Sequence, residues 1–218
     1  MTKFFKINIL ILVFALVFVS GAKCFANVLP ISVYDVPKNA IGVYQTDSKV
    51  TVYEKPSSTS KVLFDYDIDY KSFSDKDRSD VFAVIVPDKQ LGYLYVIDTS
   101  EDENWVKVVY NKYSMDCGWV YKNDEFQFMP WFDFVSLYGR KYGITQLRTK
   151  DYSFEVYSNP DDDAQIIGKI SHPRYIRMTS IEGNWLLVTA LDSNNEIITG
   201  YIKWRNTSGE IFFFPLLK

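Results

Sequence analysis

The feature of this sequence that most constrains its fold is an internal repeat. The pattern V-Y-x-x-P occurs at residues 52–56 and returns at residues 156–160. Three further blocks return in the same order: V-L at 62–63 as I-I at 166–167, N-W-V-K-V at 104–108 as N-W-L-L-V at 184–188, and G-W-V at 118–120 as G-Y-I at 200–202. Four matched blocks in one order indicate two copies of one small structural unit.

The repeated segments have the composition of β-strands. Short runs rich in Val, Ile, Tyr, Phe and Trp are separated by Asn, Asp, Ser, Gly and Pro, which predicts an all-β fold. The runs lie at 49–53, 81–86, 93–97, 105–110, 185–191 and 197–203. The stretch 131–138 fits a helical turn or a strand, and we treat it as part of a connection.

The two copies differ in the spacing of their blocks. Leu63 and Asn104 are much farther apart than their counterparts Ile167 and Asn184. We therefore expect an insertion at about 64–100 in the first copy, with an acidic, Ser-rich stretch and an added hairpin around 87–90. The predicted organisation is a first unit at 40–126, a connection at 127–141 and a second unit at 142–218.

The N-terminus has the pattern of a secretory signal peptide. Lys3 and Lys6 precede a short apolar run at 7–19, small residues follow, and the chain then becomes polar. The run is short for a membrane span. Cleavage is expected after Ala26 or Ala22, which makes 1–26 the signal peptide in the first case. The alternatives are an uncleaved anchor and a lipoprotein modified at Cys24.

Charge and cysteine content restrict the possible functions. The chain has a formal net charge of −3, and removal of residues 1–26 takes away three lysines and no acids, so the rest is more acidic still. An acidic chain without a basic run is unsuited to binding the phosphate backbone of nucleic acids. Cys117 is the single cysteine after residue 26, so no disulfide can form within the exported chain.

At the repeated blocks the sequence resembles the bacterial SH3 family. The pattern V-x-V-Y-x-x-P-S at 50–57 is followed by W-x-x-V at 105–108 and G-W-V at 118–120, and the resemblance covers about 40–125 and 142–206. It implies two small SH3-like β-barrels in tandem after the signal peptide. The second copy departs from the family in having Tyr201 in place of Trp, and the insertion in the first copy is also unusual.

The pattern has a physical reading of its own. A small barrel has a small core, so the inward positions of its strands must be Val, Ile or Leu. Pro56 and Pro160 would end a strand because proline donates no hydrogen bond to the ladder. Gly118 and Gly200 would begin the returning strand, where another chain segment comes close or a bulge forms.

The aromatic residues carry most of the functional content. The chain has 16 Tyr, 16 Phe and 5 Trp, more than small barrels can bury. In SH3-like folds a groove floored by aromatic rings binds the ligand. The resemblance places Tyr53, Trp105 and Trp119 in the first groove, and Tyr157, Trp185 and Tyr201 in the second. In the alternative, Trp119 and Tyr201 belong to the core and the other two Trp side chains cap it.

Catalytic and metal-binding patterns are weak. A cysteine peptidase needs a Cys–His pair, and the two candidates, Cys117 and His172, lie in different copies. Asp65, Asp67 and Asp69 alternate as in a calcium loop, but the glycine and glutamate that such a loop requires are missing. The acidic run at 161–163 reads as a solvated turn. We therefore expect no enzyme activity, no metal and no cofactor.

These observations favour an exported, non-catalytic binding protein in the periplasm or at the cell surface. Its ligand would be peptidoglycan or a partner protein of the envelope, bound in the aromatic grooves. One alternative is a protein–protein adaptor or inhibitor that uses the insertion of the first copy. A weaker alternative is an accessory role in cysteine-dependent hydrolysis.

Overall fold

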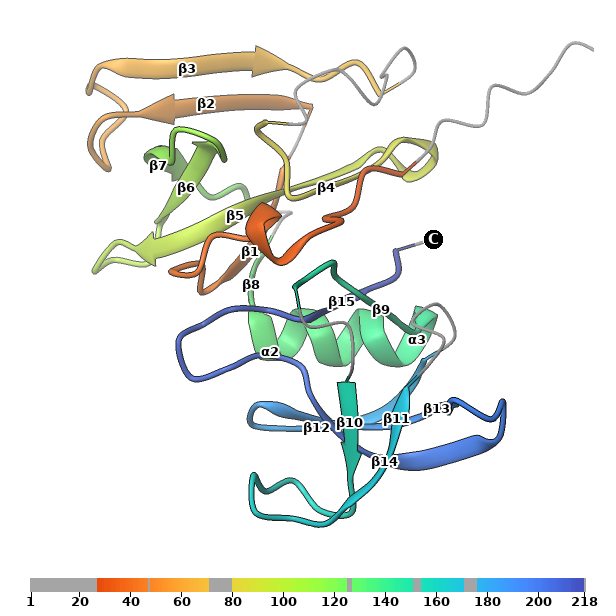
Figure 1. Ribbon diagram of the computed structural model, residues 1–218. Helices are drawn as coiled ribbons and strands as arrows, with labels where there is room; N and C mark the ends of the chain where they lie inside the picture. The colour runs from red at the N-terminus through yellow and green to blue at the C-terminus, as the bar shows by residue number, and fades with distance from the viewer. Residues whose placement is uncertain are drawn as a thin grey trace, which may run out of the picture.

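The computed structural model describes residues 27–46, 48–70, 80–124, 127–150, 154–170 and 176–217 (Figure 1). The predicted signal peptide, with Cys24 and both cleavage positions, lies outside these residues, and so does His172. Among the described residues, no helix has the length and apolar character needed to cross a bilayer.

Strands are the main regular structure of the described residues, which confirms the all-β prediction. The first sheet contains β1 (Gly42–Thr46), β2 (Lys49–Tyr53), β3 (Val62–Asp67), β4 (Val84–Val86), β5 (Leu91–Thr99), β6 (Trp105–Asn111), β7 (Asp116–Tyr121) and β8 (Phe128–Pro130). The second sheet contains β10 (Phe154–Tyr157), β11 (Ile166–Ile170), β12 (Arg177–Glu182), β13 (Trp185–Leu191) and β14 (Ile197–Lys203). A two-stranded sheet joins β9 (Ile144–Gln146) to β15 (Phe213–Pro215).

The two larger sheets repeat one strand order. The first runs β3-β2-β7-β6-β5 before it continues through β1 to β8, and the second runs β11-β10-β14-β13-β12. Neighbouring strands in both of these orders pair antiparallel. The matched sequence blocks therefore occupy equivalent places, with V-Y-x-x-P ending β2 and β10, and G-W-V or G-Y-I in β7 and β14.

Irregularities of the strands repeat as well. A register shift lies between Val52 and Tyr53 in β2, and another lies between Val156 and Tyr157 in β10. A second pair of shifts lies at 96–98 in β5 and at 178–180 in β12. Because a bulge bends its strand at a fixed place, shared bulges give the two sheets the same local twist.

The predicted closure of the sheets into barrels is wrong, because both sheets are open. In the described residues, the edge strand β3 pairs with β2 alone, and the edge strand β12 pairs with β13 alone. In the first sheet β5 pairs on its far side with β1 and β4 rather than with the opposite edge. Those added strands occupy the donors and acceptors that closure would need.

The strand β5 is buried on both faces. Tyr93 and Tyr95 point into one cluster of buried side chains, whereas Leu94 and Val96 point into another. This explains why the sequence there is a continuous apolar run rather than an alternating one. β4 and β5 form an antiparallel hairpin through the 3₁₀ turn η2 (Pro87–Lys89), at the place where the sequence predicts one.

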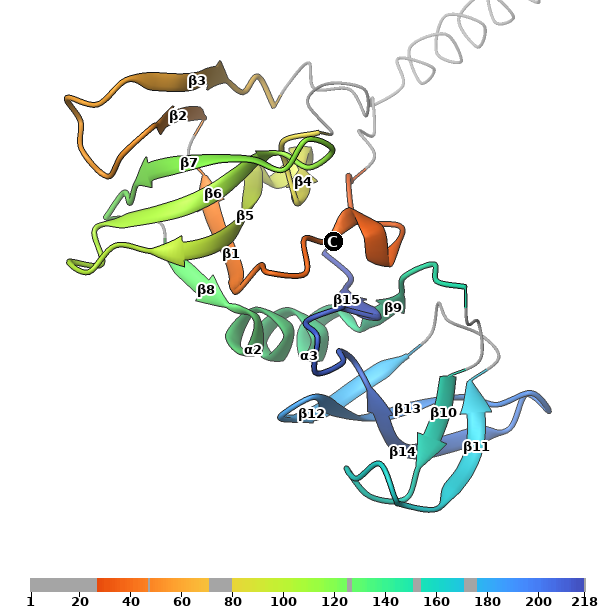
Figure 2. The same cartoon turned by 60° about the vertical axis from the view of Figure 1, so that its left-hand side comes forward.

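The connection between the sheets is helical. After β8, α2 (Trp131–Phe134), the π-helix η3 (Val135–Gly139) and α3 (Arg140–Tyr142) follow without a break. Figures 1 and 2 show this helix between the two sheets. Trp131 and Phe134 are fully buried, and the Trp131 indole N–H donates to the carbonyl of Ala40 (2.6 Å).

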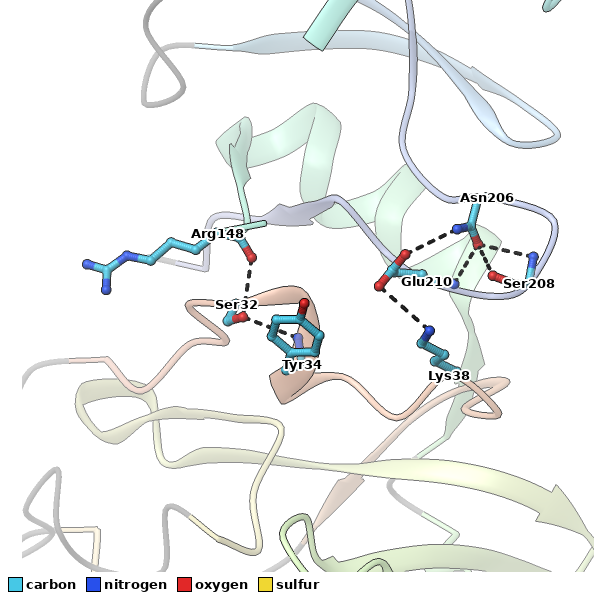
Figure 3. Close-up of polar contacts among 7 residues, drawn as sticks. All are labelled: Ser32, Tyr34, Lys38, Arg148, Asn206, Ser208 and Glu210. Atoms are coloured by element: carbon cyan, nitrogen blue, oxygen red, sulfur yellow. Dashed lines mark hydrogen bonds and ion pairs between the residues drawn. The ribbon is translucent and has the colours of Figure 1, made fainter. Parts of the chain in front are cut away.

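The segment before β1 contacts both halves of the molecule. Val28 pairs with Ile85 of the first sheet, and Ser32 pairs with Arg148, which follows β9. Ser32 also caps η1 (Val33–Asp35), because its hydroxyl accepts from the amide of Tyr34 (3.3 Å). Figure 3 shows this segment beside the turn at 206–210, where the Lys38 ammonium lies 3.8 Å from the Glu210 carboxylate.

Candidate binding surfaces

The first set of predicted aromatic residues lies on one face of its sheet. Tyr53 pairs with Trp119, and Trp105 pairs with Tyr121. Side chains of directly paired residues point to the same side of a sheet. These four residues form what we call the first aromatic face, and the alternating valines of the same strands, such as Val106, point into the core on the other side.

Within the first aromatic face the four rings are buried to different depths. Trp105 is 7% exposed, and its ring meets Tyr53 (5.6 Å between centroids, 89°) and Tyr121 (5.2 Å, 75°) edge to face. Trp119 is half-buried, and Tyr121 is 58% exposed. Trp105 therefore supports the other rings, and Trp119 and Tyr121 are the ones that solvent reaches.

A hollow of about 450 Å³ lies against Trp119. Its other walls are Pro56, which follows β2, and the β5–β6 loop at 99–102. The exposed carboxylates of Glu101 and Asp102 make this hollow acidic. The Lys107 ammonium lies 5.8 Å from the centroid of the Trp119 ring, which shows that a cation fits over this indole.

The Asp102 carboxylate has a fixed orientation. It accepts hydrogen bonds from the Ser100 hydroxyl (2.5 Å) and from the backbone and side-chain nitrogens of Asn104 (3.1 and 2.9 Å). These bonds, the one from Ser100 first, lower the pKa of Asp102 to about 2. The hollow therefore keeps this negative charge at any pH above that value.

A second hollow borders the same aromatic face. It has a volume of about 250 Å³ and lies between β1, β2 and β7. Tyr53, Tyr121, Lys49 and Asn123 are among its walls. Tyr53 borders this hollow and its cross-strand partner Trp119 borders the other, so both hollows lie against the first aromatic face.

The second set of predicted residues also shares one face. Tyr157 pairs with Tyr201, and the Trp185 ring meets the Tyr157 ring edge to face (5.2 Å, 75°). Trp185 is 8% exposed, whereas Tyr157 and Tyr201 are half-buried. We call these three residues the second aromatic face. The Lys203 ammonium lies 5.0 Å from the Trp185 ring centroid and pairs with Asp162.

The hollow beside the second aromatic face is small, about 150 Å³. Phe154, Glu155, Tyr157, Lys203 and Phe212 line it. The first aromatic face has the larger hollows, so it has the stronger features of a ligand site.

The six predicted aromatic residues thus lie in two groups, but the burial of their side chains matches neither of the two sequence interpretations in full. Trp119 and Tyr201 reach solvent, and the two residues nearest to full burial are Trp105 and Trp185. Sequence reasoning missed Tyr121 and the acidic loop at 101–102. The alternation of β7 marks Tyr121, since it stands two residues after Trp119; the loop gave no comparable signal.

Among the described residues, the cysteine and aspartate candidates for catalysis and metal binding do not come together in a site. Cys117 is half-buried on β7 opposite Val109, and its suggested partner lies outside the described residues. Asp65 pairs with Lys49 (3.4 Å), and the Asp161 carboxylate accepts from the amide of Asp163 (2.9 Å). No group of three His, Cys, Asp or Glu side chains placed to hold a metal occurs in the part of the chain that the structure describes.

Comparisons with known proteins add no relative. No protein-family model matches the chain, and none of the curated proteins is significantly similar to it. The resemblance to the bacterial SH3 family is therefore a prediction from the sequence blocks.

Proposed function

We propose that this protein is an exported, non-catalytic binding protein of the bacterial envelope, and that it recognises peptidoglycan through its aromatic faces. Each repeated unit would be an open variant of the SH3-like arrangement. The observation that carries the proposal is the first aromatic face, where Trp119 borders one hollow and Tyr121 borders another. Peptidoglycan combines sugar rings with short peptides, and both can lie along such a surface.

The chemistry of this surface suits that ligand. Aromatic rings offer flat apolar faces to the C–H groups of sugars and to peptide side chains, and the tyrosine hydroxyls add hydrogen bonds. Glu101 and Asp102 place negative charge at one end of the surface, which favours the free amino groups of peptides. At the other end Lys49 and Asn123 offer donors.

A partner protein is the alternative ligand, and it would use the same aromatic surface. A contact through the insertion of the first unit has less support. Among its described residues, Ile68, Val81, Phe82 and Ile85 are buried in the core of that unit and offer no apolar surface to a partner.

Retention on purified peptidoglycan sacculi tests the proposal. We expect the wild-type chain to sediment with sacculi, and Trp119→Ala to bind at least about tenfold more weakly, since central aromatic contacts dominate binding energies. Tyr113→Ala is the matched control, because Tyr113 is 81% exposed and lies outside both aromatic faces. Equal retention of Trp119→Ala and Tyr113→Ala, or no retention of the wild type, would refute peptidoglycan binding at this face.

A further inference from the structure

Away from the aromatic faces, two lysines from different elements meet at one tyrosine. The Lys89 ammonium, at the end of η2, donates to the hydroxyl of Tyr142 (3.2 Å) and lies 4.9 Å from its ring centroid. The Lys141 ammonium, from α3, lies 5.0 Å from the same centroid. Two positive charges therefore share one phenol ring.

The position of this phenol is fixed by its neighbours. The ring of Tyr142 stacks on that of Tyr138 (6.3 Å between centroids, 9°). The Tyr138 hydroxyl is hydrogen-bonded to that of Tyr93 (2.8 Å), and Tyr93 is fully buried in β5. A group anchored in this way to the core is already ordered before any ligand arrives.

The two lysine charges have no carboxylate partner within the described ranges, where the ion pairs involve Lys38, Lys49, Lys169 and Lys203. Like charges that share a site repel each other, and an anion between them removes the repulsion. The nearby ammonium groups, that of Lys141 first and that of Lys89 second, lower the pKa of Tyr142, as an excess of positive charge should.

We propose that Lys89, Lys141 and the hydroxyl of Tyr142 form a binding site for a phosphate-type oxyanion. The oxyanion would accept charge-assisted hydrogen bonds from both ammonium groups and a third from the phenol O–H. The Lys89 ammonium from η2 and the Lys141 ammonium from α3 each lie within 5.0 Å of the centroid of one phenol ring, so an anion with several oxygens could accept from both and from the hydroxyl. Inorganic phosphate and the phosphodiester of an envelope polymer share this chemistry.

The ionisation of Tyr142 reports on the site. The phenolate absorbance of the whole chain is titrated with pH, with and without inorganic phosphate, at an ionic strength matched with chloride. Tyr142→Phe identifies which part of the titration belongs to this residue. Bound phosphate adds negative charge beside the phenol, so we expect the pKa of Tyr142 to rise in phosphate and to stay unchanged in chloride.

Substitutions distinguish phosphate binding at this site from general electrostatic screening by the salt. Lys89→Gln and Lys141→Gln should each weaken phosphate binding by about tenfold or more, because each removes a hydrogen bond to a charged group. Lys38→Gln removes an exposed lysine elsewhere and should leave binding unchanged. A parallel titration with poly(glycerol phosphate) shows whether the site takes a polymer phosphodiester, free phosphate or both. Binding of either ligand supports the site. No response to both ligands, or an equal loss in Lys38→Gln, would overturn the proposal.

Discussion

Gly118 and Gly200 hold equivalent places, each against the strand that carries the V-Y-x-x-P block, β2 or β10. A Cβ on Gly118 would come within 2.5 Å of the Val52 side chain and 2.8 Å of the carbonyl of Tyr53. A Cβ on Gly200 would come within 2.7 Å of both Val156 and the carbonyl of Tyr157. Since one obstacle in each case is backbone, a side chain cannot be accommodated by a rotamer change alone.

Alanine at either glycine should therefore destabilise the protein. We expect Gly118→Ala and Gly200→Ala each to lower the free energy of unfolding by about 1–3 kcal/mol, the cost of forcing extra volume into a packed site. Urea denaturation followed by tryptophan fluorescence measures the change. Gly183→Asn is the control, because no atom lies within 4 Å of the Cβ position there and Asn tolerates its positive φ. A loss in Gly183→Asn as large as in Gly118→Ala would contradict the packing explanation.

The low pKa of Asp102 in the acidic loop leads to a prediction about how this turn responds to pH. The pKa of Asp102 is lowered in the folded protein from 3.8 to about 2, so its ionised form contributes stability to the turn above pH 3.8. This contribution is lost as the pH falls from 3.8 toward 2. The amide NMR signal of Asn104, which donates to this carboxylate, should shift in that window and not in Asp102→Asn. A shift of the same size in Asp102→Asn would show that another group titrates there.

At the residue scale, the sequence predicts which aromatic side chains share a face but not how deeply each is buried. The sharing follows from alternation along strands whose register is fixed by the V-Y-x-x-P and G-W-V blocks. The depth of Trp105 depends on Tyr53 and Tyr121, which come from two other strands and pack edge-on against it. Contacts of that kind leave no local pattern in the sequence.

At the scale of elements, the helix at 131–142 is the feature that the sequence left ambiguous. Its buried residues Trp131, Phe134, Val135 and Gly139 recur at the helical spacing of three and four, but the segment is short and its aromatic and β-branched residues also favour a strand. The centre, Val135–Gly139, is a π-helix. The Arg140 guanidinium bonds back to the carbonyl (3.0 Å) and hydroxyl (2.6 Å) of Ser136. These bonds satisfy backbone and side-chain oxygens at the irregular turn, which no periodic pattern would reveal.

The aromatic side chains of this helix join its neighbours together. Phe134 meets Tyr93 of β5 (5.6 Å between centroids) on one side and Phe214 of β15 (5.6 Å) on another. We expect Phe134→Ala to lower the free energy of unfolding by about 3–5 kcal/mol, the usual cost of removing a buried aromatic ring. Thermal or urea unfolding measures it.

Phe132→Ala on the same helix is the matched control. The Phe132 side chain is 49% exposed, so its loss should cost less than about 1 kcal/mol. A small effect of Phe134→Ala, similar to that of Phe132→Ala, would mean that the helix is not part of the core that joins the sheets.

At the scale of the whole molecule, the two repeated units complete their cores differently. In the first unit the residues of the insertion, among them Phe82 and Ile85, cover the valines of β2, β6 and β7. In the second unit Leu186 and Ile202 belong to one cluster with Phe134 of the helix. The repeat predicts two similar sheets, but it does not show that part of the apolar cover of the second sheet comes from the helix, outside its own sequence block.

This difference leads to a prediction about fragments. Residues 142–218 alone would lose part of the apolar cover of the second sheet, since Phe134 and Val135, which share a cluster with Leu186 and Ile202, belong to the helix. Apolar burial contributes about 25 cal/mol per Å², and a small sheet without that cover cannot offset its conformational entropy. We expect this fragment to give the narrow amide NMR spectrum of an unfolded chain, and a fragment that begins at residue 127 to retain more structure. Cooperative unfolding of 142–218 by itself would show instead that the second unit is an independent domain and that the helix is only a spacer.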